Sequence, residues 1–469
     1  MKRTTLLRFA VVLGLSFGGE VASASVFRVD ANSTAGTPDG ASWITAYASL
    51  QEAIDPSINT SLAAGDEIWI AQGTYHPDDG TLDRTATFQL VHRVSMRGGF
   101  KGLSDLPNGD TQILDASLTI LSGDLEGDDE DVNGDTTDNS LVVVTAGLDA
   151  QNIVDNLTRL EYLTIERGDH TQYGGSGSDG DGAGIVISEG SNPQILNCII
   201  RNNNVPEDNR GAGVLILTQD TLLNVRVEGC SIENNNARVG AGICVVGSFV
   251  DAVDTTIKEN HLNAQTTSPV FPVEGAGFYL DSESIGTFTQ CTIRENTWVA
   301  DDDLQMESPA YGAGGSSHGQ LTMRHCEIIA NTLTGLNAQP NGGGVYLGAP
   351  AELIDCTFDS NIAWGKFFAY GAGLALDQAA SGTEIVNCQF ELNLGGTVAP
   401  NATTGYGGGI YIGGSADMVN SLIAENFVNG KGGGIYDAAG TSRFVNCTIA
   451  ENEARIDQGG GWFIATTAT

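Results

Sequence analysis

The sequence has few basic residues and, beyond its first residues, no long apolar run. It contains 21 Lys and Arg against 58 Asp and Glu, a formal net charge of −37. Nucleic acids and anionic membrane surfaces both need a basic face, so neither is an expected partner. Acidic polysaccharides would also be repelled unless a divalent cation bridged them. No later stretch reaches about 18 apolar residues, so the mature chain should lack a transmembrane helix.

Two further patterns are missing. No Cys-x-x-Cys pair occurs, which argues against a zinc site. Helical periodicity and a Leu-x-x-Leu-x-Leu frame are also missing from most of the chain, which disfavours helical and leucine-rich repeats. Glycine, in contrast, accounts for 62 of the 469 residues. Because 41% of the residues are hydrophobic, the glycines are expected to serve an ordered structure rather than disorder.

The N-terminus has the layout of a secretory signal peptide over residues 1–24. Lys2 and Arg3 form a basic start, residues 6–17 are mostly apolar, and Ala22-Ser23-Ala24 supplies a small-x-small cleavage pattern. An uncleaved membrane anchor is the weaker interpretation, because the apolar run is too short to span a bilayer. We therefore expect export, to the cell surface, the outer membrane or the extracellular space.

Two short motifs alternate along the chain from about residue 163. One is Cys-x-[Ile/Phe]-x-x-Asn, with Thr or Ser replacing Cys in two copies; it begins at Cys198, Cys230, Thr255, Cys291, Cys326, Cys356, Cys388, Ser421 and Cys447. The other is Gly-x-Gly, which begins at Gly182, Gly211, Gly240, Gly275, Gly312, Gly342, Gly371, Gly407, Gly432 and Gly459. Repeats of this length made of short strands predict a solenoid.

The repeat predicts an all-β fold, a parallel β-helix of about ten coils in which equivalent residues stack every ~4.8 Å. The Cys and the Ile two places later should face the interior of one wall. The Asn should end that wall at a bend, where stacked amides can bond to each other and Asn tolerates a left-handed backbone. The glycines should mark the next corner. Since Thr255 and Ser421 cannot form disulfides, free buried thiols are favoured over stacked-coil disulfides, although export leaves the second option open.

On these motifs, the chain from about residue 152 onward resembles the secreted right-handed parallel β-helix proteins of bacteria, the pectin-lyase-like superfamily. It is also similar to the polymorphic outer membrane protein repeats, whose signatures are Gly-Gly-Ala-[Ile/Leu/Val] and Phe-x-x-Asn. The segments FDSN at Phe358 and FELN at Phe390 match the second signature, whereas GGGV at Gly342 and GGGI at Gly407 and Gly432 carry Gly in place of Ala. The resemblance implies a right-handed solenoid that is exported and displayed at a surface.

Residues 25–145 do not follow the period, and we expect a small N-terminal α/β cap there, followed by repeats over 146–469. Strands are predicted at 66–75 and 94–100, and a helix over 42–54 with its apolar side chains on one face: Ile44, Tyr47, Leu50 and Ile54. Repeat arrays usually end in a polar cap. The last repeat stops after its Gly-x-Gly, so we expect that the sequence is truncated and that an anchor could follow Thr469.

The acidic segment after residue 122 follows the opening of an EF-hand-like calcium loop. Asp129, Asp131, Asn133 and Asp135 occupy alternate positions around Gly134, as hard oxygen ligands of calcium do. Ser140 stands where the bidentate Glu is expected, so a solvated acidic loop is the alternative. Calcium is thus the one cofactor that the sequence suggests.

Long segments follow the Asn corner in several coils and should gather along one edge of the solenoid. They carry the candidate glycan-binding aromatics Trp298, Trp364, Phe367, Phe368, Tyr370 and Tyr406, together with Phe271. Aromatic rings on a rigid scaffold can stack on sugars. The alternative is that these rings pack over the coil edge.

Catalysis has weaker support. Arg201, Lys258 and Arg294 share one outward position and could supply a lyase base, but ordinary solvated side chains explain them as well. Residues 301–303 are three adjacent aspartates rather than a converging pair. The polygalacturonase-like and pectate-lyase-like signatures are absent from the sequence. We therefore expect an adhesin-like or structural protein that binds polysaccharide or cell-surface glycans, with a polysaccharide lyase or glycoside hydrolase on the same edge as the alternative.

Overall fold

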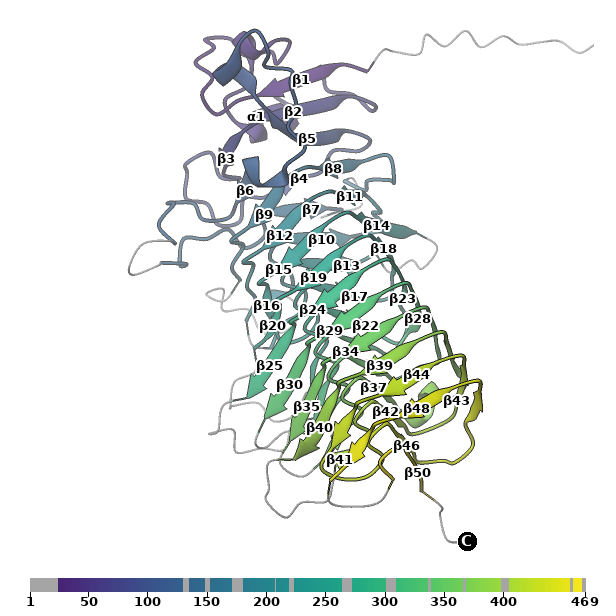
Figure 1. Ribbon diagram of the computed structural model, residues 1–469. Coiled ribbons are helices and arrows are strands. Elements are labelled where there is room, and N and C mark those ends of the chain that lie inside the picture. The colour runs from purple at the N-terminus through teal and green to yellow at the C-terminus, as the bar shows by residue number, and fades with distance from the viewer. Residues whose placement is uncertain are drawn as a thin grey trace, which may run out of the picture.

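The protein is a right-handed parallel β-helix (Figure 1). In this computed structural model the described residues are 24–129, 135–147, 152–170, 180–206, 208–218, 223–263, 272–300, 309–335, 339–365, 368–397, 405–455 and 459–465. The strands of these residues form three long parallel sheets, A, B and C, and two shorter ones, D and E. The predicted fold class is confirmed.

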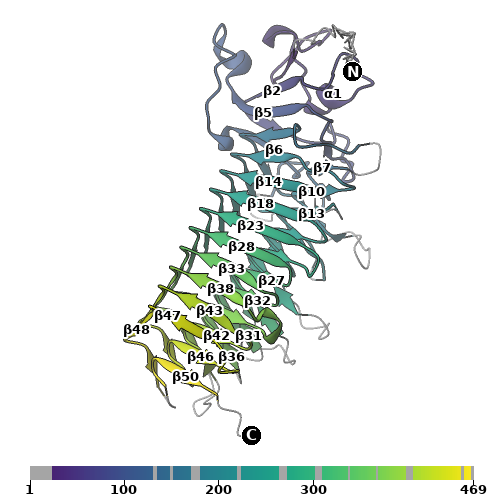
Figure 2. The same ribbon diagram turned by 90° about the vertical axis from the view of Figure 1, so that its right-hand side faces the viewer.

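Sheet A is the tallest stack, and Figure 2 shows its strands one above another. Its strands, in order, are β1 (Val26–Val29), β2 (Glu67–Ala71), β5 (Ser95–Phe100), β8 (Arg159–Glu161), β11 (Gln194–Leu196), β14 (Asn224–Glu228), β18 (Phe249–Val253), β23 (Ile285–Thr289), β28 (Gln320–Arg324), β33 (Ala351–Ile354), β38 (Thr383–Val386), β43 (Ala416–Val419) and β47 (Arg443–Val445).

Sheet B contains the Cys-x-Ile segments. Its strands are β3 (Gly73–Tyr75), β6 (Thr119–Ser122), β9 (Thr164–Glu166), β12 (Ile199–Arg201), β15 (Ser231–Glu233), β19 (Thr256–Lys258), β24 (Thr292–Arg294), β29 (Glu327–Ile329), β34 (Thr357–Asp359), β39 (Gln389–Glu391), β44 (Leu422–Ala424) and β48 (Thr448–Ala450).

Sheet C follows the Gly-x-Gly motifs. Its strands are β4 (Phe88–Gln89), β7 (Val144–Ala146), β10 (Ile185–Ser188), β13 (Val214–Leu217), β17 (Ile243–Val245), β22 (Phe278–Leu280), β27 (Gly315–Ser317), β32 (Val345–Leu347), β37 (Leu374–Leu376), β42 (Ile410–Ile412), β46 (Ile435–Asp437) and β50 (Trp462–Ile464).

Sheets D and E form a side lobe, because five successive coils leave the body along D and return along E. Sheet D consists of β16 (Asn236–Ala237), β20 (His261–Leu262), β25 (Thr297–Ala300), β30 (Thr332–Gly335), β35 (Ile362–Gly365), β40 (Leu394–Thr397), β45 (Phe427–Val428) and β49 (Glu453–Ala454). Sheet E consists of β21 (Val273–Glu274), β26 (Pro309–Tyr311), β31 (Gln339–Asn341), β36 (Ala369–Tyr370) and β41 (Gly405–Tyr406). Figure 1 shows the D strands running along one flank of the body.

Apolar side chains on the inner faces of sheets A, B and C fill the body. Alternate residues of the strands point inward, as the period of two requires, and they form one continuous cluster. Four buried phenylalanines contact each other in pairs: Phe278 and Phe288 are tilted with ring centroids 4.5 Å apart, and Phe358 and Phe390 stack at 4.7 Å. The lobe has a smaller core of its own, which includes Trp298 and Leu333.

The asparagine of each repeat forms the predicted amide ladder. Asn331 is representative: its Nδ2 donates to Asn361 Oδ1 at 3.0 Å, and its Oδ1 accepts from Asn296 Nδ2 at 3.0 Å. One detail of the prediction is wrong, because the left-handed backbone belongs to the residue before the asparagine, for example Ala330 at φ 54°. The asparagine itself is needed for its amide, which faces inward and is fully buried.

The two sequence motifs meet at the base of the lobe. The first glycine of each Gly-x-Gly has positive φ, as predicted, for example 73° at Gly342. The second glycine lies against the asparagine of the same turn: a Cβ on Gly344 would be 2.4 Å from Gly373 O and 3.1 Å from the Asn361 amide. This contact closes the body into a ring at the point where the lobe leaves it. It explains why the motifs alternate.

All eight cysteines are free thiols, and seven are buried, as predicted. Those of the ladder stack on sheet B. Each Sγ donates to main-chain oxygens nearby; Cys326 Sγ lies 3.3 Å from Phe288 O. Thr255 Oγ1 makes the same kind of bond, to Val227 O at 3.3 Å. The position therefore needs a small inward donor rather than a disulfide partner.

The N-terminal residues extend the β-helix instead of forming a separate cap. Strands β1 to β7 belong to sheets A, B and C, and β5, β6 and β7 pair with the first strands of the repeats. The predicted boundary at residue 145 falls inside β7. The strands predicted at 66–75 and 94–100 are present as β2, β3 and β5.

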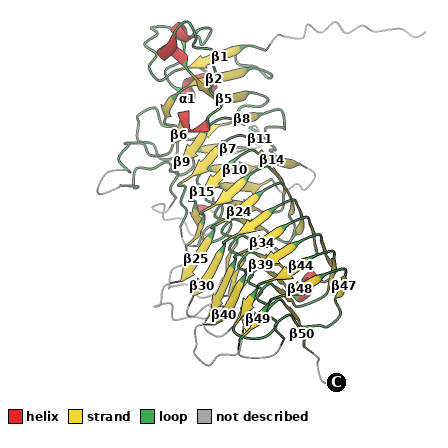
Figure 3. Cartoon of the chain, viewed as in Figure 1, coloured by secondary structure: helices red, strands yellow, loops and turns green. Residues whose placement is uncertain are grey.

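Helices are few and gather mainly near the N-terminus (Figure 3). The described helices are η1 (Trp43–Thr45), α1 (Leu50–Ile54), η2 (Gly102–Asp105), η3 (Ala116–Leu118) and η5 (Gln378–Ala380). The predicted helix over 42–54 is split into η1 and α1, because Ala46 and Ser49 have extended backbones. As a result Ile44 is exposed rather than buried. Within the described residues, none of these helices has the length and apolar character needed to cross a membrane.

Candidate functional site: an aromatic groove

Two columns of aromatic side chains follow the corner where sheet C meets the lobe. One column consists of the middle residues of β22, β32, β42, β46 and β50, and the other of the residues just before three of the Gly-x-Gly motifs, on sheet E. We call these rings and the adjacent His318 the aromatic groove: Tyr279, Tyr311, His318, Tyr346, Tyr370, Tyr406, Tyr411, Tyr436 and Phe463.

The columns arise from strand alternation and parallel register. In β42, Ile410 and Ile412 point into the core, so Tyr411 between them points outward and is half-buried. In β36, Ala369 faces the lobe interior and Tyr370 faces the groove. Because the strands pair in register, each outward position stacks on its equivalent in the next coil. The columns therefore run parallel to the solenoid axis.

The rings touch within and between the columns. Tyr370 stacks on Tyr406 with centroids 5.4 Å apart, and Tyr411 stacks on Tyr436 at 5.7 Å. Across the groove, Tyr370 meets Tyr411 edge-on at 4.8 Å and Tyr406 meets Tyr436 at 4.8 Å. Such offset and edge contacts are favourable arrangements for aromatic rings. They pack the two columns against each other.

The phenols of the groove are neutral hydrogen-bonding groups. Burial, and then the neighbouring tyrosines, raise the pKa of Tyr370 to about 12. Burial, followed by Asp377, raises the pKa of Tyr346 well above its usual range. At neutral pH these hydroxyls can therefore both donate and accept hydrogen bonds without carrying charge.

Two carboxylates lie among the rings, and both have partners. Glu274 Oε2 is 2.6 Å from His318 Nε2 and accepts from Ser316 Oγ at 3.0 Å. Burial lowers the pKa of His318, but its hydrogen bond to Glu274 raises it more, so the net pKa is above the ordinary value. Asp377 Oδ2 accepts from the Tyr346 hydroxyl at 3.1 Å, and Asp377 itself remains exposed.

The structure separates the six aromatics predicted as glycan-binding candidates. Phe368, Tyr370 and Tyr406 lie together, with Phe368 stacked 6.2 Å from Tyr370. Trp298 is 2% exposed in the lobe core, so its predicted place at an open edge is wrong: it is on the inward face of β25. Trp364 is half-buried on the outer face of sheet D, across the lobe from the groove. Phe367 lies outside the described residues, as do Phe271 and residues 301–303.

Sequence reasoning missed the C-strand column altogether. The signal is present in the repeat, because an aromatic residue stands two places after the second glycine in five copies. These residues are Tyr279, Tyr346, Tyr411, Tyr436 and Phe463. They lie outside the long segments to which the search was confined.

The repeats match a known family. Residues 173–262 and 249–454 match the model described as right handed beta helix region. The chain belongs to this right-handed β-helix family. No curated protein compared with it matches significantly.

One solved structure matches this right-handed β-helix protein. It is the tailspike protein gp49 from Acinetobacter baumannii bacteriophage Fri1, a capsular polysaccharide depolymerase, at 12% sequence identity and a TM-score of 0.31. The match covers 83% of the present chain and 58% of the tailspike chain. The β-helix protein thus spans less than two thirds of that chain.

The basic residues considered for catalysis form an ion-pair column on sheet B of the β-helix protein. Arg201 Nε is 2.7 Å from Glu166 Oε2, and Lys258 Nζ is 3.0 Å from Glu233 Oε2. Arg294 pairs with Glu295 at 2.5 Å. Each of these cations therefore already has a carboxylate partner, on a sheet that does not line the groove.

The acidic loop of the β-helix protein is only partly described. Asp131 and Asn133 lie outside the described residues, whereas Asp135 is exposed and accepts from Thr137 N at 2.9 Å. Asp129 Oδ2 is 3.0 Å from Arg167 Nη1. Ligand atoms of Asp124, Asp128 and Asp129 lie within 4.8 Å of one another. Calcium stays a prediction, with Asp124 and Asp128 added to the residues that could bind it.

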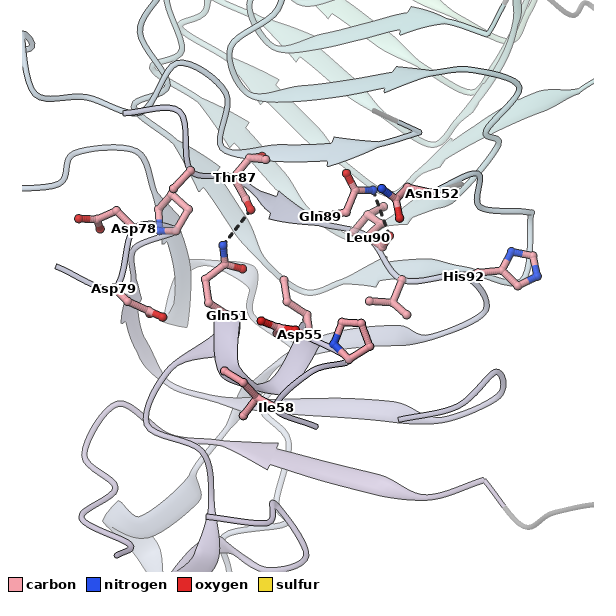
Figure 4. Close-up of a pocket in the computed structure, with 15 residues that line it drawn as sticks. Gln51, Asp55, Ile58, Asp78, Asp79, Thr87, Gln89, Leu90, His92 and Asn152 are labelled. Carbon is pink, nitrogen blue, oxygen red and sulfur yellow. Dashed lines mark hydrogen bonds between the residues drawn. The ribbon is translucent and has the colours of Figure 1, made fainter. Parts of the chain in front are cut away.

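A hollow of about 570 Å³ lies between α1 and residues 86–92, which include β4 of sheet C (Figure 4). Its amides are already used within the chain: Gln51 Nε2 donates to Thr87 O at 3.1 Å, and Gln89 Nε2 donates to Leu90 O at 3.2 Å. Ile54 and Leu90 contribute apolar wall. No predicted site residue lines this hollow, and its lining residues do not include stacked aromatic rings.

Proposed function

We propose that this exported β-helix protein binds polysaccharide or cell-surface glycans along the aromatic groove. The observation that carries the proposal is the pair of ring columns, Tyr370–Tyr406 and Tyr411–Tyr436, at the corner between sheets C and E. Aromatic rings offer apolar surface to the C–H faces of sugars at a small entropic cost. Neutral phenols beside them can exchange hydrogen bonds with sugar hydroxyls.

Charge favours neutral glycans over acidic ones. The chain has a net charge of −37, and Glu274 and Asp377 add carboxylates to the groove itself. Uronate-bearing polymers would be repelled, whereas sugar hydroxyls can donate to carboxylate oxygens. We therefore expect the strongest binding to uncharged hexose or pentose polymers.

Binding without cleavage is the preferred form of the proposal. A glycosidase needs a proton donor and a second carboxylate on either side of one bond. Of the described groove carboxylates, Glu274 is held by His318 and Ser316, and Asp377 by Tyr346. A hydrolase or lyase acting in the same groove remains the alternative, and product release would favour it.

Export is part of the same proposal. It rests on the basic, apolar and small-residue segments of residues 1–24, which lie outside the described residues except for Ala24. An adhesin-like or structural role at a cell surface or in the extracellular space would bring the groove to glycans. Expression of the full sequence, followed by N-terminal sequencing of the exported product, tests this step; a start at Ser25 supports it, and retention of Met1 in the cytoplasm contradicts it.

Binding is tested by titrating the purified protein with soluble β-glucan, mannan and xylan, and with polygalacturonate as the acidic comparison. We expect binding to at least one neutral polymer, and at least tenfold weaker binding by the double variant Tyr370→Ala/Tyr411→Ala. Trp364→Ala is the matched control, because it removes a ring from the opposite face of the lobe and should leave affinity unchanged. No binding to any neutral polymer, or equal losses in both variants, would refute the proposal, and new reducing ends would point to the enzyme.

A further inference from the structure

The asparagine ladder of the body does not extend to the coil that contains β6. Asn203 Oδ1 accepts from the main-chain N–H of Gly168 at 3.0 Å. Because β12, β9 and β6 pair in register, Gly168 takes the ladder position in the next coil toward the N-terminus, and Asp124 takes it in the coil beyond. Neither residue has a side-chain amide. The body is therefore closed in another way beside Asp124.

The segment that follows Asp124 folds back on itself. The described residues between β6 and β7 contain no strand, so this coil lacks the lobe. Asp138 Oδ2 accepts from the main-chain N–H of Glu126 at 2.8 Å. Asn139 Nδ2 donates to Asp129 Oδ2 at 3.0 Å. The beginning and the end of the segment are thus held against each other.

Four side-chain oxygens of this segment are buried and have no hydrogen-bond partner: Asp128 Oδ1, Asp129 Oδ1, Asp138 Oδ1 and Asn139 Oδ1. Ten such polar atoms occur among all the described residues, so their concentration here calls for a cause. Asn139 is 2% exposed, and the side chain of Asp129 is 7% exposed. The bond from Asn139 Nδ2 to the Asp129 carboxylate fixes which end of the amide is the oxygen. All four unpartnered atoms are acceptors, so the ligand that fits them is a cation.

The cluster is small enough to surround one ion. Ligand atoms of Asp124, Asp128 and Asp129 lie within 4.8 Å of one another. The oxygen and nitrogen of one amide are about 2.3 Å apart, so Asn139 Oδ1 lies within about 5.3 Å of Asp129 Oδ2. Oxygens on opposite sides of a calcium ion, each about 2.3–2.6 Å from it, are about 4.6–5.2 Å apart. The two ranges agree.

Arg167 brings one positive charge to the cluster but does not balance it. Its Nη1 is 3.0 Å from Asp129 Oδ2 and 3.7 Å from Asp124 Oδ2. Asp128 and Asp138 form no ion pair with any described residue. Partial burial, followed by the carboxylates of Asp138 and Asp124, raises the pKa of Asp128. A divalent cation among these oxygens would offset their mutual repulsion.

We propose that one calcium ion closes the body in the coil of β6 and β7, where the asparagine ladder is missing. Its ligands are the side-chain oxygens of this cluster: Asp124, Asp128, Asp129, Asp138 and Asn139. Calcium prefers hard carboxylate and amide oxygens and accepts six to eight of them in irregular arrangements. This inference does not rest on the proposed glycan binding, because the cluster lies outside the aromatic groove.

The ligand set differs from the EF-hand-like one that the sequence suggests. Asp129 belongs to both sets. Asp135, in contrast, is exposed and its Oδ1 accepts from the main-chain N–H of Thr137. The two arrangements therefore predict different effects of substitutions within one acidic segment: Asp138 is a ligand only in the new set, and Asp135 only in the EF-hand-like set.

Calorimetric titration of the EDTA-stripped protein with calcium and, separately, with magnesium tests the site. Ionic strength of about 0.15 M screens diffuse binding to the acidic surface. We expect one calcium site with a dissociation constant below about 1 mM. Asp128→Asn and Asp138→Asn should each weaken calcium binding at least tenfold. Asp135→Asn is the matched control, because it removes one charge from the same segment, and it should bind calcium as the wild type does.

Hydrogen exchange of the wild type, in calcium and in EDTA, tests the closing role without any substitution. Calcium should slow exchange most in β6, β7 and β9, because stability in a solenoid depends mainly on adjacent coils. This measurement decides alone if Asp128→Asn and Asp138→Asn do not fold. Unchanged exchange in these strands while calcium is bound would refute the closing role.

The remaining outcomes of the titration separate the ion from its ligands. No calcium site in the wild type, or only weak binding that all three variants keep, would refute the proposal. Equal losses in Asp135→Asn and Asp138→Asn would overturn the ligand set in favour of the EF-hand-like one. Magnesium binding as tight as calcium binding would overturn the identity of the ion.

Discussion

Replacement of Asn331 by alanine tests the closure of the body by the asparagine ladder. Asn331 is fully buried, and its side chain takes part in four hydrogen bonds. Its Nδ2 donates to Ile293 O at 2.9 Å and to Asn361 Oδ1 at 3.0 Å. Its Oδ1 accepts from the main-chain N–H of Asn296 at 3.1 Å and from Asn296 Nδ2 at 3.0 Å.

The expected cost follows from these four bonds. Each intramolecular hydrogen bond contributes about 1 kcal/mol net, and a buried group left without a partner costs about 1–3 kcal/mol. Asn331→Ala removes all four bonds and leaves the Asn296 N–H facing a small void. We therefore expect a loss of about 3–5 kcal/mol in the free energy of unfolding.

Urea titration followed by circular dichroism measures the loss, and hydrogen exchange should show the fastest new exchange in the coils that contain β24, β29 and β34. Stability in a solenoid depends mainly on adjacent coils, so the effect should be local. Asn156→Ala is the control, because its exposed side chain lies in a turn, and it should change stability by less than about 0.5 kcal/mol. A loss below about 1 kcal/mol for Asn331→Ala would refute the argument that the buried amide closes the ring.

Three further predictions follow from the described contacts. Cys326→Ser should lower the free energy of unfolding by about 1 kcal/mol or less, because the serine hydroxyl can donate to Phe288 O as the thiol does. A thiol reagent should react with at most Cys447 before the protein unfolds, and rapid reaction of several native thiols would contradict this. The raised pKa of His318 means that its ion pair with Glu274 stabilises the fold fully below the ordinary pKa of 6.5, and that this stabilisation is lost as pH rises through the folded pKa. The difference in melting temperature between the wild type and His318→Gln should therefore shrink from pH 5 to pH 9. A difference that stays constant over this range would count against the ion pair. Calcium should raise the melting temperature of the wild type but not of Asp128→Asn, whereas identical melting of the wild type in calcium and in EDTA would remove the calcium hypothesis.

The fold could be predicted from the sequence because a solenoid repeats its local rules. Each coil needs a residue with a left-handed backbone at the corner, buried asparagine and cysteine side chains that donate hydrogen bonds, and a glycine beside the buried asparagine. These requirements recur at nearly constant spacing in the chain. Even so, the sequence did not show why the second glycine of each Gly-x-Gly motif is needed. Gly344 is required because Gly373 O and the Asn361 amide approach it, and those atoms belong to other segments.

The groove was predicted only in part, because the search followed loop length rather than strand direction. Tyr370 and Tyr406 were found in long segments, but their partners Tyr411 and Tyr436 are in the repeat itself. The same reasoning placed Trp298 among the binding residues, but its side chain lies in the core of the lobe. Which face a lobe residue takes depends on its position in the strand. Trp364 stands one register position after the equivalent of Trp298 in sheet D, so strand alternation puts Trp298 inside the lobe and Trp364 on its outer face.

The sequence by itself determined the period, the corners, the inward ladders and the net charge, since each depends on residues close together in the chain. The tertiary structure alone decided that sheets D and E form a lobe, that sheets C and E share one corner lined by aromatic rings, and that His318 fills the place of the missing ring at Ser316. The physical reason is that the groove contacts join residues of different coils, and parallel stacking brings those residues together only once the strand register is set.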